Sequence, residues 1–130
     1  MPAFPEAQQM TESLVHPTAS VASGADVDPS VRIGPGVVIE SDVRIGAGTT
    51  IGPYAIIRRF TYIGENNSID AHAVIGGAPQ HTSYDGSETW VRIGDNNTVR
   101  EYVTIHRAYE AGAETRIGSN CFLMTGTHVG

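Results

Sequence analysis

The chain has 130 residues, a formal net charge of −6 and eight basic residues, all of them arginine. Its length is typical of one domain, and an acidic chain without a basic run argues against nucleic acid as the main partner. No apolar run approaches the roughly 18 residues of a membrane-spanning helix, so membrane insertion is not expected.

The first thirteen residues differ from the rest of the chain. They lack the basic start and apolar centre of a signal peptide, and the repeat described next begins only at Val15. We therefore predict that residues 1–13 form a disordered lead-in and that residues 14–130 form the domain. Cys121 is the only cysteine, which fits a core residue of a reduced, cytoplasmic protein.

Aliphatic residues recur every six positions from Val15 onward. Eleven of the twelve isoleucines fall on this frame, and every frame position from Val15 to Ile75 is Val or Ile. A chance run of this length has odds on the order of one in 10⁷, and neither a helix nor an ordinary strand repeats every six residues. A hexapeptide period is typical of a parallel β-helix, in which each short strand points one aliphatic residue inward and then turns.

The other positions of the hexapeptide agree with this interpretation. The residue after the aliphatic one is often glycine, where we expect a corner that needs φ above zero. The fifth position is mostly small or β-branched, so each flat face of a narrow prism holds one large and one small side chain. Three hexapeptides, one for each strand, make up one coil and predict three columns of stacked residues: Val15, Ile33, Ile51 and Ile69; Val21, Ile39, Ile57 and Ile75; and Val27, Ile45 and Ile63.

Two polar segments interrupt the frame, at residues 76–86 and 107–114. In the first, polar residues such as His81 occupy aliphatic positions before Ile93 resumes the frame, which predicts an inserted loop of about six residues. In the second, Tyr109 falls where only a small side chain fits. A regular solenoid with two polar loops is a rigid scaffold that carries a site, so function is expected there, although both loops could be tolerated insertions.

Four of the five histidines are predicted to point outward from the prism: His16, His72, His106 and His128. The last two follow the loops, and their separation is slightly more than the three hexapeptides of one coil, so they should lie on neighbouring strands of one face. His81 lies in the first loop beside Gln80. These three histidines and the amide are predicted to line one outer face as a polar site, which by itself names no reaction.

Four segments carry a resemblance to a known enzyme family. Residues 93–107 (IGDNNTVREYVTIHR) and 117–130 (IGSNCFLMTGTHVG) resemble the acyl-carrier-protein:UDP-N-acetylglucosamine O-acyltransferases, which begin lipid A synthesis in Gram-negative bacteria. Residues 15–19 (VHPTA) and the loop at residues 79–84 (PQHTSY) fit the same pattern. Many transferases share hexapeptides, but the V-T-I-H-R and L-M-x-x-x-H segments at this distance are far more specific.

The resemblance implies a fold, an assembly and a reaction. Members of this family are cytoplasmic homotrimers of left-handed parallel β-helices, with active sites in the clefts between subunits. They move an (R)-3-hydroxyacyl group from acyl carrier protein to the 3-hydroxyl of UDP-N-acetylglucosamine, without a metal or an organic cofactor. A histidine acts as the general base on that hydroxyl, a role that suits a group titrating near neutral pH.

Individual site residues follow from the matched motifs. His128 corresponds to an active-site histidine that lies three residues before the catalytic base. His106 corresponds to a histidine near the bound nucleotide sugar, and Met124 to a residue of the same cleft. Gln80 and His81 fall where the family has Gln-Asp in contact with the sugar.

The chain also departs from the family pattern. The matched base falls at position 131, and the coils of the acyl-chain groove and the C-terminal helical domain also lie beyond Gly130, so a truncated, catalytically inactive β-helix is expected. Without those coils the sequence does not indicate the length of the acyl chain. His81 replaces an aspartate, and a neutral histidine can donate where a carboxylate only accepts. Ser83 stands where many members have lysine.

Other functions of hexapeptide proteins remain open from the sequence. The N-acyltransferase of lipid A synthesis, or another hexapeptide acyltransferase, has the same helix, but the former normally has a preceding globular domain that residues 1–13 cannot supply. A zinc-dependent γ-class carbonic anhydrase needs a His-x₄-His pair, and Ala111 stands at that offset from His106. An inactive structural β-helix remnant would not need two polar loops with histidines beside them.

Overall fold

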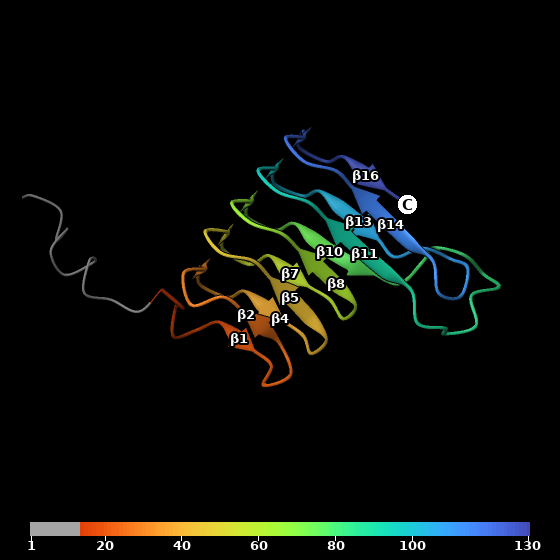
Figure 1. The fold of residues 1–130 in the computed structure, drawn as a ribbon, viewed down its shortest axis with the longest axis horizontal. Coiled ribbons are helices and arrows are strands. Elements are labelled where there is room, and N and C mark those ends of the chain that lie inside the picture. Colours follow the sequence, from red (N-terminus) through yellow and green to blue (C-terminus); the bar gives the residue numbers. More distant parts are fainter. Residues whose placement is uncertain (1–13) are drawn as a thin grey trace, which may run out of the picture.

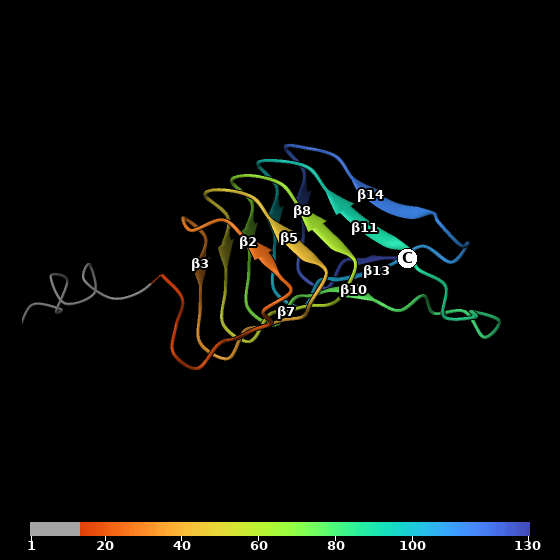
Figure 2. The same ribbon diagram turned by 60° about the horizontal axis from the view of Figure 1, so that its bottom comes forward.

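Residues 14–130 of the computed structural model form a parallel β-helix, in which the chain coils around one axis in short strands (Figure 1 and Figure 2). The strands pair in parallel, and no helix occurs between residues 14 and 130. The predicted disordered lead-in, residues 1–13, lies outside the described residues.

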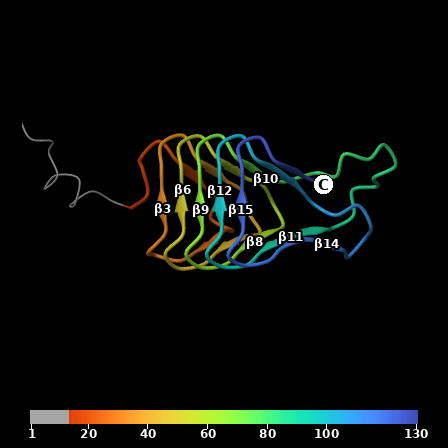
Figure 3. The same cartoon turned by 90° about the horizontal axis from the view of Figure 1, so that it is seen from above.

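Three sheets form the three faces of the prism, and each sheet takes every third strand. Sheet A contains β3 (Arg32–Ile33), β6 (Thr50–Ile51), β9 (Ser68–Ile69), β12 (Thr98–Val99) and β15 (Phe122–Leu123). Sheet B contains β1 (Ser20–Val21), β4 (Val38–Ile39), β7 (Ile56–Ile57), β10 (Val74–Gly77), β13 (Thr104–His106) and β16 (His128–Val129). Sheet C contains β2 (Asp26–Val27), β5 (Val43–Ile45), β8 (Thr61–Ile63), β11 (Trp90–Ile93) and β14 (Glu114–Ile117). Figure 3 shows the strands of sheet A side by side, from β3 to β15.

The strand register confirms the predicted columns. Ile33 pairs with Ile51 and Ile51 with Ile69, so each partner lies three hexapeptides further along the chain. The columns that begin at Val21 and Val27 follow the same register. One coil therefore consists of three strands, and each frame residue lies directly above its counterpart in the next coil.

The frame residues and the fifth-position residues form the core. Ile57, Ile63 and Ile75 are fully buried, as are the fifth-position residues Val37 and Ala55. Burying a valine or isoleucine side chain contributes about 1.5–3 kcal/mol to the stability of the fold. The hydrophobic contribution is therefore spread along the whole axis rather than concentrated in one central cluster.

The glycines that follow the frame residues allow close packing between coils. We predicted that these glycines adopt φ above zero, and this is wrong for all but one of them. Only Gly76 among them has such a φ, of 91°. A Cβ added at Gly46 would lie 2.8 Å from the carbonyl carbon of Gly64 on the next coil, and one added at Gly64 would lie 2.7 Å from the Gly94 carbonyl oxygen. Left-handed residues occur instead at the fourth position, as at Asn66 with φ of 55°.

Two buried asparagines at fifth positions connect successive coils. Asn67 is 2% exposed and Asn97 is 1% exposed. The Asn67 side chain donates to the Gly94 carbonyl at 2.8 Å and accepts the backbone N–H of Asn97 at 2.9 Å. Asn97 in turn donates to the Gly118 carbonyl and accepts the N–H of Cys121, both at 2.8 Å. The two amides thus satisfy backbone groups that this corner of the prism buries.

The first loop is longer than predicted. Ile63 pairs with Ile93, which lies five hexapeptides further along the chain instead of three, so this coil is longer by two hexapeptides and not by about one. Ile93 pairs with Ile117, four hexapeptides further along, so the second loop adds the length of one hexapeptide. Both loops leave the prism on the same side (Figure 1). After each loop the strands return to the register of the earlier coils.

Replacing Ile45 by aspartate tests the stacked core. Ile45 is 1% exposed and lies between Val27 and Ile63 in its column. Because the carboxylate would be buried without a partner, we expect a loss of about 3–5 kcal/mol in the free energy of unfolding, measured by chemical denaturation. Ser68→Asp, at an exposed position of β9, should change it by less than about 1 kcal/mol. An Ile45→Asp variant as stable as the parent would contradict the fold.

Candidate functional site

β10 contains a β-bulge where the first loop leaves the prism. Its pairing with β13 is regular as far as Ile75, but His106 then pairs with Gly77, so Gly76 is an extra residue in the ladder. The φ of Gly76 lies in the region that favours glycine, and an added Cβ would collide with the Thr61 hydroxyl group. The bulge therefore requires glycine, and it bends the strand toward the loop.

Residues 106 and 107 bind three consecutive carbonyl groups at the start of this loop. Nη1 of Arg107 donates to the Gly76 carbonyl at 2.8 Å. The backbone N–H of Arg107 donates to the Gly77 carbonyl, also at 2.8 Å. Nδ1 of His106 lies 2.8 Å from the Ala78 carbonyl oxygen. These three contacts, called the carbonyl clamp below, set the direction in which the loop leaves β10.

Arg107 also reaches the middle of the first loop. Its Nη2 lies 3.4 Å from the Tyr84 hydroxyl, which donates to the Ser87 carbonyl. The guanidinium carbon lies 5.5 Å from the centre of the Phe60 ring, a cation–π distance. The Ser87 hydroxyl and backbone N–H lower the pKa of Asp85, so that carboxylate is ionised at neutral pH and stabilises the turn. One arginine thus fastens the loop both at its base and near its tip.

The two loops contact each other through an aromatic pair. The His81 ring stacks on Tyr109 with centroids 3.8 Å apart and planes 20° apart. The Tyr109 hydroxyl donates to the Ser83 carbonyl at 3.4 Å, and the Ser83 N–H donates to Nδ1 of His81 at 3.2 Å. The extra residues of the second loop place Tyr109 outside the prism, 40% exposed, and not at an interior position.

His106 and His128 lie on adjacent strands, as predicted. Thr104 of β13 is opposite His128 of β16, and the two imidazole centroids are 5.1 Å apart in an edge-to-face arrangement. Nδ1 of His128 lies 2.8 Å from the Thr104 hydroxyl oxygen. A hydroxyl can either donate or accept, so this contact orients the His128 ring without determining which nitrogen carries the proton.

These side chains surround one hollow of about 260 Å³ between the loops and sheet B. Its lining consists of Pro79, Gln80, His81, His106, Arg107, Tyr109, His128 and Gly130. Four of the five predicted site residues therefore lie together: Gln80, His81, His106 and His128. Met124, between β15 and β16, does not line the hollow and is 69% exposed. His72 is elsewhere, stacked between Tyr54 and Tyr102 on an exposed corner.

The lining of the hollow contains imidazole, amide and guanidinium groups and no acidic side chain, although the chain has a net charge of −6. Six other arginines between residues 14 and 130 form ion pairs, whereas the hydrogen bonds of the Arg107 side chain within this range go only to carbonyl and hydroxyl groups. The hollow is therefore suited to a ligand with hydroxyl or anionic groups. Across the described residues, no group of three His, Cys, Asp or Glu side chains could hold a metal ion.

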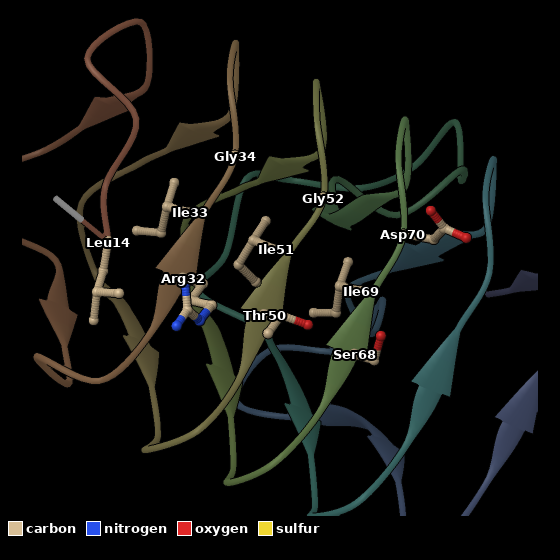
Figure 4. Close-up of a pocket in the computed structure, with 10 residues that line it drawn as sticks. All are labelled: Leu14, Arg32, Ile33, Gly34, Thr50, Ile51, Gly52, Ser68, Ile69 and Asp70. Atoms are coloured by element: carbon tan, nitrogen blue, oxygen red, sulfur yellow. The ribbon is translucent and has the colours of Figure 1, made fainter. Parts of the chain in front are cut away.

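A larger depression of about 440 Å³ lies on the outer face of sheet A. Arg32, Thr50 and Ser68 form a row across β3, β6 and β9 there, with Asp70 at one end (Figure 4). Its lining contains no histidine. Rows of outward side chains arise on every face of a regular β-helix, because alternate residues of each strand point outward. We therefore assign the candidate site to the hollow, where the chain departs from the repeat.

Sequence reasoning did not identify three features of the hollow and of the contacts that support it. Tyr109 was expected to mark a break in the frame, but not to stack on His81. Arg107 belongs to the V-T-I-H-R motif, and its position next to His106 was the available signal. The Ala78 carbonyl is a backbone group, so no residue type points to it.

Comparisons with known proteins agree with this geometry. A model described as bacterial transferase hexapeptide (six repeats) matches residues 42–77. Curated acyl-[acyl-carrier-protein]–UDP-N-acetylglucosamine O-acyltransferases from Psychrobacter arcticus and Rickettsia canadensis are 50% identical over 118 residues and 40% identical over 122, covering 90% and 93% of this chain. The solved structure of LpxA from Acinetobacter baumannii is 40% identical over 89% of this chain, with a TM-score of 0.86.

The hexapeptide repeat, the three parallel sheets and the likeness to the solved LpxA structure together define a left-handed parallel β-helix of the hexapeptide-repeat type, as predicted. Along nearly all of its described length, the chain is similar to the N-terminal portion of the acyl-[acyl-carrier-protein]–UDP-N-acetylglucosamine O-acyltransferases, which confirms the resemblance found in the sequence. The chain spans about half the length of these relatives, 46% of each curated protein and 45% of the solved one.

Substituting two glycines by alanine tests the bulge. Gly76 and Gly86 have similar φ values of 91° and 85°, but an added Cβ at Gly76 would lie 3.0 Å from the Arg58 carbonyl oxygen, whereas at Gly86 nothing lies within 4 Å. Alanine would be strained by the positive φ at either position. The difference between the two losses in the free energy of unfolding therefore measures the steric crowding at Gly76. We expect Gly76→Ala to lower the free energy of unfolding by about 1–3 kcal/mol more than Gly86→Ala in chemical denaturation. Equal losses would contradict a bulge packed on the preceding coil.

Proposed function

We propose that this chain is the N-terminal part of an acyltransferase that moves an (R)-3-hydroxyacyl group from acyl carrier protein to the 3-hydroxyl of UDP-N-acetylglucosamine, the first step of lipid A synthesis. The names of the curated relatives contain both the acyl carrier protein and the sugar nucleotide. The observation that carries the proposal is the gathering of Gln80, His81, His106 and His128 in one hollow, because these positions were matched by motif and not by proximity.

The chemistry of the lining supports a sugar-nucleotide ligand. Imidazoles and an amide supply donors and acceptors for sugar hydroxyls, and a lining without acidic side chains avoids repulsion of a diphosphate. In this role Gln80, His81 and His106 bind the acceptor sugar. Met124, four residues before His128, is assigned to the cleft by the matched motif alone, because it does not line the hollow.

The proposed reaction needs a base near the 3-hydroxyl. The base takes the hydroxyl proton while the oxygen attacks the acyl carbonyl, so that the new acyl–oxygen bond forms and the bond to the carrier breaks. By the matched motif the base is at position 131. His128, oriented by the Thr104 hydroxyl, supports that group as a neighbouring hydrogen-bonding residue.

The proposal includes a cytoplasmic homotrimer with the hollow in a cleft between subunits. The outer face of sheet B presents Val38, Ile56 and Val74 in register, and the row continues to Thr104 beside the hollow. Val38 is 37% exposed. Such an aliphatic row is suited to being covered by a second subunit. Between residues 14 and 130 no helix is long and apolar enough to cross a membrane.

A coupled assay with UDP-N-acetylglucosamine and 3-hydroxyacyl carrier protein tests the reaction. In the gene product extended past Gly130, His106→Ala and His128→Ala should each lower kcat/KM at least roughly tenfold, because each removes a group near the reacting sugar. His72→Gln is the matched control and should keep the parental value, since His72 lies on a distant corner.

A polypeptide limited to residues 1–130 lacks the matched base and should show no turnover. Parental activity in that polypeptide would contradict the proposed position of the base. Unchanged kcat/KM in both histidine variants of the extended protein would contradict the proposed site.

Light scattering at micromolar concentration tests the assembly. The chain has a mass of 13.8 kDa, and we expect a species of three times this mass. Val38→Glu should favour the monomer because it adds a charge to the aliphatic row, whereas Arg44→Gln on sheet C should not. A monomer for both the 130-residue chain and the extended gene product would contradict the trimer.

A further inference from the structure

One contact of the carbonyl clamp determines where a proton lies. A carbonyl oxygen only accepts hydrogen bonds, so the 2.8 Å contact between the Ala78 oxygen and Nδ1 of His106 requires the hydrogen on Nδ1. In the neutral imidazole, Nε2 then carries a free lone pair. No group between residues 14 and 130 forms a hydrogen bond to this Nε2, so it is available to a ligand.

The His106 ring is held over its face as well as at its edge. It lies over Gly77, where an added Cβ would be 3.4 Å from Cε1 and 3.5 Å from both ring nitrogens. The His128 ring meets it edge-on at 5.1 Å. A larger residue at position 77 would displace the ring, and the ring cannot exchange its acceptor unless the start of the loop moves.

The Arg107 side chain also binds the start of the loop. The bulge removes Gly76 from the regular ladder, and Nη1 of Arg107 binds the carbonyl of that same residue. Nε of Arg107 is buried and has no hydrogen-bond partner among the described residues. An unpaired buried N–H destabilises a fold, so this arginine is poorly explained as a residue that only adds stability.

We infer that Arg107 is a positioning residue for His106. By binding the carbonyls of Gly76 and Gly77, it keeps the next carbonyl, that of Ala78, against Nδ1 of His106. This holds His106 in the tautomer with the proton on Nδ1 and leaves Nε2 as an acceptor in the hollow. Such an acceptor binds a hydroxyl or an amide N–H, the donor groups of an N-acetylated sugar. The identity of that ligand rests on the proposed function, whereas the tautomer rests on the carbonyl clamp alone.

Nitrogen-15 NMR of the imidazole side chains tests this inference at a pH above the usual range of histidine titration. In the parent protein, Nδ1 of His106 should show the shift of a protonated nitrogen and Nε2 that of a bare one. Arg107→Gln should give a mixture of tautomers at His106, with the fold verified by circular dichroism. The matched control is Arg44→Gln, which removes an exposed arginine paired with Asp26 and should leave both His106 signals unchanged.

Two results would overturn the inference: a proton on Nε2 in the parent, or the parental tautomer in Arg107→Gln. If Arg107→Gln does not fold, Tyr84→Phe serves as a milder variant, because it removes only the hydroxyl that Nη2 contacts. It should move the same two His106 signals in the same direction by a smaller amount. Unchanged signals in Tyr84→Phe would then count against the positioning role.

Titration with UDP-N-acetylglucosamine separates this inference from the proposed function. A change in the Nε2 signal of His106 supports both, and Arg107→Gln should weaken binding roughly two- to tenfold, the effect of one lost hydrogen bond. The inferred tautomer without any response to the sugar nucleotide would overturn the proposed ligand and leave the positioning role supported.

Discussion

The stacking of each coil on the next is the constraint on which the rest of the structure depends. Most strands contain only two or three residues, so none is stable without its partners in the neighbouring coils. The same requirement explains the glycines at Gly46 and Gly64, where a side chain would strike the next coil. It also explains the buried amides of Asn67 and Asn97, which bind backbone groups one coil further on. The residues of the core, the residues at the corners and the strand register therefore all follow from the stacking of one coil on the next.

The candidate site follows from the same constraint. Extra residues cannot stay inside a coil of fixed circumference, so they must leave the prism and return in register, as Ile93 does beside Ile63. The bulge at Gly76 bends β10 away from the prism, and the carbonyl clamp holds the start of the loop against β13. Because both loops leave on one side, His81 and Tyr109 meet and enclose a hollow beside the histidines of sheet B. A regular scaffold therefore holds an irregular site rigidly.

The sequence predicted those features that repeat. A six-residue period fixes the strands, their stacking and the pairing of the strands that carry His106 and His128, because each follows from counting along a uniform coil. It did not predict the loop length, since His81 stands on the frame without belonging to a strand. The glycine pattern was misinterpreted because close approach and positive φ both select glycine. The clamp was missed because its acceptors are backbone carbonyls, and the importance of Gly76 depends on Thr61 in the preceding coil.

A crystal structure with bound UDP-N-acetylglucosamine tests most directly the claim that the hollow, and not the larger depression on sheet A, is the substrate site. The account predicts the sugar between the two loops, with a hydroxyl or amide nitrogen about 3 Å from Nε2 of His106. The Ala78 carbonyl should remain on Nδ1 of the same ring. Sugar nucleotide bound over β3, β6 and β9, with the hollow empty, would contradict the account.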